Sequence, residues 1–373
     1  MTINKFVMPG VNFQGLGCLE EAIAEAKAQG AQKLLIVTDK GIEAAGVLAQ
    51  VEDAINKLEL AYVVHTDVQP NPTKANVMNG LAVLKDANCD FVMSLGGGSP
   101  HDCAKAIALL ATNEGATIDD FVGFDVPGKN ALPLIAINTT AGTAAEMTRF
   151  AVITCEDRHI KMPIVNQKLT PAISVNDPAL MLGLPAHITA ATGMDALTHA
   201  IEAYISIAAS PLSDANAEKA ISLIGEFLPR CVEHGKDAQA REMMAYAEFM
   251  AGMAFNNASV GYVHALAHQL GAVYNLPHGL CNALLLPHVL KFVQPSCKSR
   301  MAKVADLLGA NDAATATAEL AKRIGLPATL TELYVKEEDI EKMAKMAVED
   351  VSALTSPRQA SVEEVMAIYR AAM

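Results

Sequence analysis

The chain has few basic residues and no long uninterrupted hydrophobic run. Its 373 residues include 28 Lys and Arg against 41 Asp and Glu, which gives a formal net charge of −13. This excess of negative charge argues against binding to nucleic acid or to an anionic membrane surface. No apolar run reaches the roughly 20 residues that a membrane-spanning helix needs, so we expect no membrane partner.

Signals for secretion and for disulfide cross-linking are also missing. The opening MTINKFVMPGVNFQG has no apolar core behind a basic region, so we expect no signal peptide. The seven cysteines are odd in number, scattered, and never arranged as Cys-x-x-Cys. This usage indicates reduced thiols and predicts a cytoplasmic protein.

Three familiar motifs do not occur in the chain. It contains no G-x-G-x-x-G fingerprint, no G-x-x-x-x-G-K-[ST] loop and no G-x-S-x-G elbow. A phosphate-binding turn must therefore be recognised from other features, and nothing indicates a serine nucleophile.

The chain has ample apolar material for buried cores, since 51% of its residues are hydrophobic and 18% are charged. That composition excludes a disordered chain. The length exceeds the roughly 250–300 residues that one core usually supports, so we expect two domains.

The sequence pattern changes near residue 184. Before it, β-branched apolar runs alternate with helical stretches, which predicts a doubly wound parallel sheet in an α/β, Rossmann-like domain over residues 1–184. After it, the pattern is almost continuously helical, which predicts an all-α domain over residues 185–373. We expect the chemistry in the cleft between these domains. The predicted strands lie in KLLIVTD, AYVVHTD, CDFVMSLGGGSP, LPLIAINTT and AVIT.

Four metal-ligand residue types lie in the helical half. Asp195 and His199 are four residues apart in GMDALTHAIEAY, so one helix face presents both to the same ion. His264 and His278 follow in GYVHALAHQLG and NLPHG. A single histidine is more often a core or surface residue, but four such residues in small, apolar helical contexts favour a site for Fe²⁺ or Zn²⁺.

A glycine-rich turn follows the strand FVMSL. In GGGSPHDCAKAIALL, the glycines allow close backbone approach, and Ser99 with the following helix N-terminus offers donors to a pyrophosphate. Such turns also occur for structural reasons alone. A second polar turn, from Asn138 to Thr148, follows LPLIAI, and both turns are expected at the carboxyl edge of a parallel sheet.

Asp39 ends the first long strand, KLLIVTD. A carboxylate there can accept hydrogen bonds from an adenosine ribose and repels a 2′-phosphate, which favours NAD over NADP. The alternative is a helix N-cap before GIEAAG.

These segments together resemble the iron-dependent, group III alcohol dehydrogenases, in the bacterial branch that holds short-chain alcohol dehydrogenases and lactaldehyde reductase. The resemblance rests on GGGSPHDCAKAIA, INTTAGTAAEMTRF, ATGMDALTHAIEAY, GMAFNNASVGYVHALAHQLG and NLPHGLCNALLLPHVL, and extends from FVMPGVNFQG to TSPRQ. It implies a dehydroquinate synthase-like architecture, NAD, a catalytic Fe²⁺ that some members replace with Zn²⁺, and a homodimer formed through N-terminal strands, here KFVMPGVNFQG.

The resemblance also implies roles for individual residues. The metal ligands would be Asp195, His199, His264 and His278, with His268 beside the nicotinamide. Asp39 would contact the adenosine ribose. The pyrophosphate would lie on Gly97, Gly98 and Ser99, and further cofactor contacts would come from Asn71, Thr139, Thr140, Thr143, Thr148 and Lys161.

Three functions agree with these features. The first is NAD- and metal-dependent interconversion of small primary alcohols or diols with their aldehydes. The second is a metal-dependent lyase or synthase on the same scaffold, and the third is a non-catalytic NAD-binding regulatory protein. The apolar residues Phe150, Val152 and Phe255 are candidates for a substrate pocket or for ordinary core, so the sequence leaves the alcohol itself open.

Overall fold

The computed structural model describes residues 3, 5–158 and 160–373 and divides into two compact units. The first unit consists of Val7–Thr140 and Ala144–Gly183. The second consists of Leu184–Met373, Ala141–Thr143 and the described residues before Val7.

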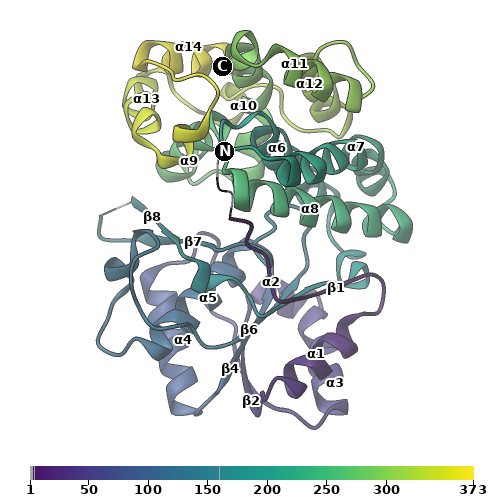
Figure 1. The fold of residues 1–373 in the computed structure, drawn as a ribbon, viewed down its shortest axis with the longest axis vertical. Helices are drawn as coiled ribbons and strands as arrows, with labels where there is room; N and C mark the ends of the chain where they lie inside the picture. Colours follow the sequence, from purple (N-terminus) through teal and green to yellow (C-terminus); the bar gives the residue numbers. More distant parts are fainter. Residues whose placement is uncertain (1–2, 4, 159) are drawn as a thin grey trace. The chain divides into compact units, whose positions relative to one another are not determined.

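A six-stranded parallel sheet forms the centre of the first unit (Figure 1). Its strand order is β1-β9-β6-β4-β2-β3, and each neighbouring pair is parallel. The strands are β1 (Val11–Gln14), β2 (Lys33–Val37), β3 (Ala61–His65), β4 (Phe91–Gly96), β6 (Leu134–Asn138) and β9 (Ile173–Asn176). The helices between them are α1 (Leu19–Ala28), α2 (Lys40–Ala44), α3 (Val47–Lys57), α4 (Lys74–Asp86) and α5 (Gly98–Thr112).

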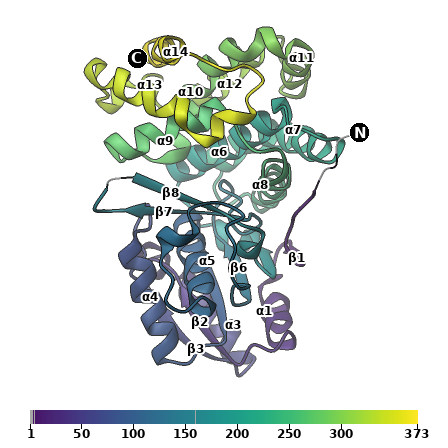
Figure 2. The same cartoon turned by 60° about the vertical axis from the view of Figure 1, so that its left-hand side comes forward.

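Helices cover both faces of this sheet because its strands are apolar on both sides. Along β2, Leu34 and Ile36 pack in the same core as α1 and α3. Leu35 and Val37 point the other way and pack in the core that holds α4 and α5. Figure 2 shows α1 and α4 on opposite sides of the strands. The predicted doubly wound parallel sheet is therefore confirmed.

One predicted strand was placed wrongly. AVIT lies in β7 (Phe150–Cys155), which pairs antiparallel with β8 (Ile160–Val165) instead of joining the parallel sheet. These two strands and β5 (Gly123–Phe124) make a separate three-stranded sheet. The connection from β7 to β8 is far shorter than the dozen or so residues that a parallel crossover requires.

The second unit is helical from residue 186 onward, which confirms the predicted all-α half. No helix in the described part of the chain is long and apolar enough to cross a membrane. The helices of the second unit are α6 (Ala186–Ile205), α7 (Pro211–Glu233), α8 (Ala238–Ala258), α9 (Tyr262–Tyr274), α10 (His278–Val293), α11 (Lys298–Leu307), α12 (Ala313–Arg323), α13 (Ile340–Glu349) and α14 (Val362–Ala372). Short 3₁₀ turns such as η7 (Val351–Thr355) join some of them.

Helix α6 is central to this unit and packs against α7, α8 and α10. Every residue from Gly193 to Ile205 is buried, although the segment carries the ionisable residues Asp195, His199 and Glu202. Buried ionisable groups need hydrogen-bond partners or metal ions to offset the loss of hydration. The partners of these three side chains therefore define a site.

Candidate active site

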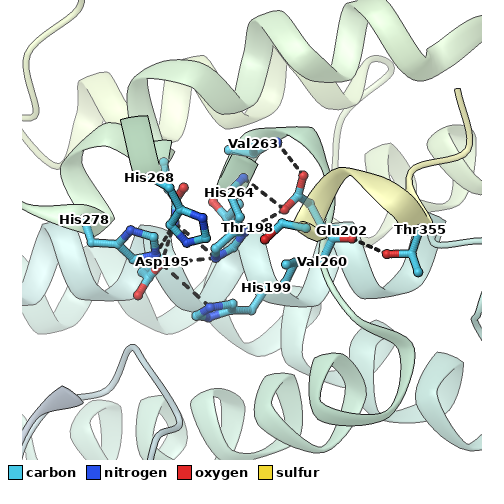
Figure 3. Close-up of polar contacts among 12 residues, drawn as sticks. Asp195, Thr198, His199, Glu202, Val260, Val263, His264, His268, His278 and Thr355 are labelled. Atoms are coloured by element: carbon cyan, nitrogen blue, oxygen red, sulfur yellow. Dashed lines mark hydrogen bonds and ion pairs between the residues drawn. The ribbon is translucent and has the colours of Figure 1, made fainter. Parts of the chain in front are cut away.

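The four predicted metal ligands meet in the second unit. Asp195 and His199 lie on α6, His264 lies on α9, and His278 begins α10 (Figure 3). Their ligand atoms all lie within 4.8 Å of one another. Asp195 Oδ1 is 4.0, 3.8 and 3.6 Å from the Nε2 atoms of His199, His264 and His278, respectively. Residues up to 83 positions apart in the sequence thus point at one small volume.

Burial favours the neutral form of two imidazoles in this cluster, those of His199 and His264. It lowers the pKa of His199 to about 3, and it also holds the pKa of His264 well below its usual range. Burial raises the pKa of Asp195, and the neighbouring His199 opposes that rise. Neutral imidazole is the form that binds a metal ion, since its Nε2 lone pair is then available.

This donor set fits a divalent metal ion. Three imidazoles and one carboxylate are ligands that Fe²⁺ and Zn²⁺ both accept. Four ligands around an ion at roughly 2.0–2.2 Å lie roughly 3.4 Å apart in a tetrahedron. The distances of 3.6–4.0 Å from Asp195 Oδ1 to the three imidazole nitrogens are slightly longer than this. Catalytic zinc sites usually have three protein ligands and an open fourth position, whereas this set has four residues. A substrate oxygen would therefore bind as a fifth ligand.

Sequence reasoning missed Glu202 on α6, whereas it named Phe255 on α8 as a pocket candidate. Both side chains pack against the candidate ligands. Glu202 Oε2 lies 2.6 Å from His264 Nδ1. Burial raises the pKa of Glu202 to about 7, and backbone N–H groups of Gly261, Val263 and His264 oppose that rise. The ring of Phe255 stacks on His199 with centroids 4.1 Å apart. Phe255 therefore packs directly on one of the candidate ligands.

A second missed residue, Asn282, lies one turn after His278 on α10. Its amide nitrogen is 2.7 Å from Asp195 Oδ1, 3.3 Å from His264 Nε2 and 3.2 Å from His278 Nε2. Asn282 is fully buried. The four-residue spacing from His278 was a usable signal, because it places both side chains on one helix face.

His268 lies beside this cluster without joining the four-residue set. Its ring stacks on that of His278 with centroids 5.4 Å apart, and its Nδ1 is 2.9 Å from Asp350 Oδ2. Asp350 also accepts a hydrogen bond from Gln269 Nε2 at 3.2 Å. The partnership with Asp350 leaves Nε2 as the ring nitrogen of His268 that can face a reactant.

Several predicted cofactor residues come together in the first unit. The backbone N–H of Asn71 donates to Ser99 Oγ at 3.3 Å, and Lys161 Nζ donates to Asn71 Oδ1 at 2.6 Å. Asn71 has a φ of 59°, a left-handed conformation that asparagine tolerates better than most residues. These three side chains come from separate parts of the chain and form one polar cluster.

The two polar turns also meet, at the carboxyl ends of β4 and β6. Gly96 and Asn138 are register partners on these neighbouring strands. A Cβ atom on Gly97 would lie 3.1 Å from Thr140 Oγ1, so glycine lets the turns approach closely. Gly98 is the first residue of α5. The turns therefore offer backbone N–H groups and hydroxyls at one edge of the sheet.

The three remaining predicted threonines occupy different surroundings. Thr139 Oγ1 is buried and has no hydrogen-bond partner among the described residues. Thr148 is buried and accepts a hydrogen bond from the ammonium group of Lys105 at 3.0 Å. Thr143 belongs to the second unit, whereas Thr139 and Thr148 belong to the first. Thr148 therefore already has a structural partner.

Asp39 caps α2, as the structural alternative predicted. Its Oδ1 accepts the backbone N–H groups of Gly41 at 2.8 Å and Ile42 at 3.0 Å. A cap of this kind uses one carboxylate oxygen. Oδ2 takes no part in the cap.

Comparison with known proteins places this geometry in a family. The family model for iron-containing alcohol dehydrogenase matches residues 9–178, and the C-terminal model of the Fe-containing alcohol dehydrogenase family matches residues 189–373. The chain belongs to the iron-containing alcohol dehydrogenase family.

Individual relatives in this family match over the whole chain. Alcohol dehydrogenase 4 of Schizosaccharomyces pombe is 50% identical, with 100% of this chain and 90% of the relative covered. The NAD-dependent methanol dehydrogenase of Bacillus methanolicus is 44% identical, with both chains covered to 100%. A solved structure of 1,3-propanediol oxidoreductase matches with a TM-score of 0.98 at 43% identity, again with both chains covered to 100%.

Proposed function

We propose that this family member interconverts small primary alcohols or diols with their aldehydes by hydride transfer with NAD(H). The observation that carries the proposal is the convergence of Asp195, His199, His264 and His278 within 4.8 Å. Its relatives include an NAD-dependent methanol dehydrogenase and a 1,3-propanediol oxidoreductase. A protein that only senses NAD has no need of such a ligand set.

The four ligand residues would hold Fe²⁺, or Zn²⁺ in its place. The bound ion supplies Lewis-acid stabilisation of the negative charge that develops on the oxygen of an alcohol during its oxidation. The chain shields these side chains from water, because Asp195, His199 and His264 are each at most 5% exposed. Low hydration strengthens every electrostatic interaction inside such a site.

His268 would move the proton that the alcohol gives up. Its Nδ1 is occupied by Asp350, so Nε2 would take the proton from the reactant side and pass it toward solvent. The side chain is 31% exposed, which gives the proton a route to water. A general base needs this combination of a fixed ring and an accessible nitrogen.

NAD would bind at the carboxyl edge of the parallel sheet in the first unit. The turn at Gly97, Gly98 and Ser99, which opens α5, would receive the pyrophosphate, since helix N-termini favour anions. Asp39 would bind the adenosine ribose. Further contacts would come from Asn71, Thr139, Thr140, Thr143, Thr148 and Lys161.

The assembly we propose is a cytoplasmic homodimer formed through the N-terminal segment KFVMPGVNFQG. Strand β1 lies at the edge of the six-stranded sheet, where its free side can pair with a strand of a second copy. All seven cysteines are free, as expected in a reducing compartment.

A substrate panel tests this function. Metal-free protein reconstituted with Fe²⁺ under anaerobic conditions, and separately with Zn²⁺, is assayed with NAD and ethanol, propanol, butanol, 1,2-propanediol or 1,3-propanediol. The reverse direction uses the matching aldehydes and NADH. We expect metal-dependent formation or consumption of NADH with at least one pair. Binding of NAD without turnover would support the regulatory alternative, and substrate conversion without net NADH would support a lyase or synthase.

A further inference from the structure

The carboxylate of Glu202 lies directly behind one of the proposed metal ligands. Its Oε2 is 2.6 Å from Nδ1 of His264, on the side of the ring opposite the nitrogen that faces Asp195. The same carboxylate accepts the backbone N–H of Val263 at 2.7 Å and that of His264 at 3.4 Å. Figure 3 shows Glu202 between the start of α9 and the His264 ring.

The backbone is shaped to let this carboxylate approach. A Cβ atom on Gly261 would lie 2.9 Å from Glu202 Oε1, closer than real Cβ contacts allow. Gly261 precedes the first residue of α9, so the helix begins against the carboxylate. Glu202 itself is 3% exposed. Glycine at this position therefore makes room for a buried acidic group beside a ligand histidine.

The surrounding backbone sets Glu202 as an acceptor. Its Oε1 accepts the N–H of Val263 and its Oε2 accepts the N–H of His264, so we assign the proton of the side-chain hydrogen bond to Nδ1 of His264. Its Nε2 then keeps a lone pair, and this is the atom that lies 3.8 Å from Asp195 Oδ1. A histidine held by a carboxylate in this way is oriented and is more basic toward a metal ion.

We propose that Glu202 is the positioning residue for His264, and that it controls how tightly the site retains its metal ion. This inference rests on the proposed function, because it assumes that His264 is a ligand. Glu202 lies seven residues after Asp195 and three after His199, so one face of α6 carries two ligands and the residue that orients a third. Metal retention is therefore coupled to the packing of α6 against the start of α9.

The variant that tests the proposal is Glu202→Gln. An amide has the volume of the carboxylate but offers one acceptor atom and one donor atom. Val263 N–H contacts Oε1 and His264 Nδ1 contacts Oε2, so the amide nitrogen replaces one of the two acceptors and one of these contacts is lost. We expect affinity for Zn²⁺ to fall by ~10–100-fold, the usual effect of removing a partner behind a metal ligand.

Thr355→Val is the matched control. Thr355 Oγ1 donates to the carbonyl of Val260 at 2.6 Å, just before α9, and this hydrogen bond involves neither Glu202 nor His264. This variant loosens the start of α9 without changing the His264 hydrogen bond. Zn²⁺ affinity of each protein is measured by competition with a chelator, and circular dichroism of the metal-free forms reports helix content.

Weaker Zn²⁺ binding in Glu202→Gln alone supports the proposal. Equal affinity in wild type and Glu202→Gln overturns it, as does an equal loss in Thr355→Val, which would assign the effect to general loosening. If the wild-type protein binds no Zn²⁺, the metal centre of the proposed function is refuted. That result differs from both outcomes that overturn the role of Glu202.

A measurement on the wild type covers the case in which Glu202→Gln does not fold. ¹⁵N-edited NMR of the Zn²⁺-loaded protein identifies the nitrogen of His264 that carries the proton. A protonated, exchange-protected Nδ1 supports the role of Glu202, whereas a proton on Nε2 contradicts it.

Discussion

Nδ1 of His268 is hydrogen-bonded to Oδ2 of the Asp350 carboxylate at 2.9 Å, while its ring stacks on that of the ligand-type residue His278. His264 and His268 share a helix face at a spacing of four residues, yet only His264 joins the cluster around Asp195. The structure thus separates two histidines that the sequence spacing could not distinguish. Their different surroundings predict different consequences of mutation.

His268→Ala is expected to keep metal content and NAD affinity close to wild type but to turn over about 10²–10⁴ times more slowly. The reason is that proton transfer loses its general base while the four ligands remain. Metal analysis, NAD titration and a pH–rate profile check this, and the profile should be flatter in the variant. A metal-free His268→Ala protein would show that His268 is a ligand.

Asp350→Asn tests the partner of His268. The amide can still contact the ring but cannot stabilise a charged imidazolium as a carboxylate does. We expect a lower kcat with little change in KM and normal metal content. Wild-type kcat in this variant would mean that Asp350 serves only to cap η7, where its Oδ1 accepts the N–H of Ser352.

His264→Ala and His278→Ala are each expected to lose bound metal and activity while keeping their helical content. Each substitution removes one nitrogen ligand from a set whose donor atoms converge within 4.8 Å. Metal analysis after chelator-free purification and far-ultraviolet circular dichroism measure the two quantities. Full metal stoichiometry in either variant would refute the ligand assignment.

Substitution of Asp39 tests cofactor choice. Asp39→Ser keeps a cap for α2, since serine is a good N-cap residue, but removes the negative charge. Asp39→Gly removes both the side-chain cap of α2 and the negative charge. We expect the ratio of NADPH to NADH activity to rise in both variants, because like-charge repulsion of the 2′-phosphate costs several kcal/mol. An unchanged ratio in Asp39→Ser would leave the cap as the only role of Asp39.

The buried His101 predicts a pH dependence of stability that is separate from the metal cluster. Burial lowers the pKa of His101 to about 3, with a further contribution from Lys105. Below the unfolded-state pKa near 6.5, the unfolded chain takes up a proton that the folded chain excludes. The free energy of unfolding therefore decreases as the pH falls from about 6.5 toward the folded-state pKa of about 3. The loss reaches about 2 kcal/mol at about pH 5.

Urea unfolding of the metal-free protein at about pH 7.5 and about pH 5 measures this loss. His101→Gln, which can still bond Ser94 Oγ, should lose about 2 kcal/mol less than wild type over this range. His187→Gln is the control, because its exposed side chain is hydrated in both states. Asp102 has its pKa raised by burial to about 6. It is present in all three proteins, so the comparison cancels its effect. Identical pH dependence in wild type and His101→Gln would contradict the account.

Local spacing made part of the site predictable. Asp195 and His199 lie one turn apart on α6, and the turns after β4 and β6 follow apolar strands directly, so sequence reading could identify each feature. The alternation of apolar strands and helices likewise predicted the doubly wound sheet. These features depend on residues within a few positions of one another.

Long-range contacts were not predictable in the same way. Glu202 and His264 are 62 residues apart, and His268 and Asp350 are 82 apart. Nothing in the local pattern around Asp350 distinguishes it from an ordinary cap residue. The AVIT strand was misplaced for a related reason, because an apolar run does not reveal which strand it will pair with.

The central claim is that the four-residue set holds a metal ion on which NAD-dependent alcohol oxidation depends. Its most direct test is a titration of metal-free protein with Fe²⁺ under anaerobic conditions. At each step the initial rate of NADH formation is measured with NAD and 1,3-propanediol, or with another active alcohol of the panel. The account predicts that the rate rises in proportion to bound Fe²⁺ and levels off at one ion per chain, and that Asp195→Ala shows neither binding nor turnover. Full NADH formation by the metal-free wild type would contradict it.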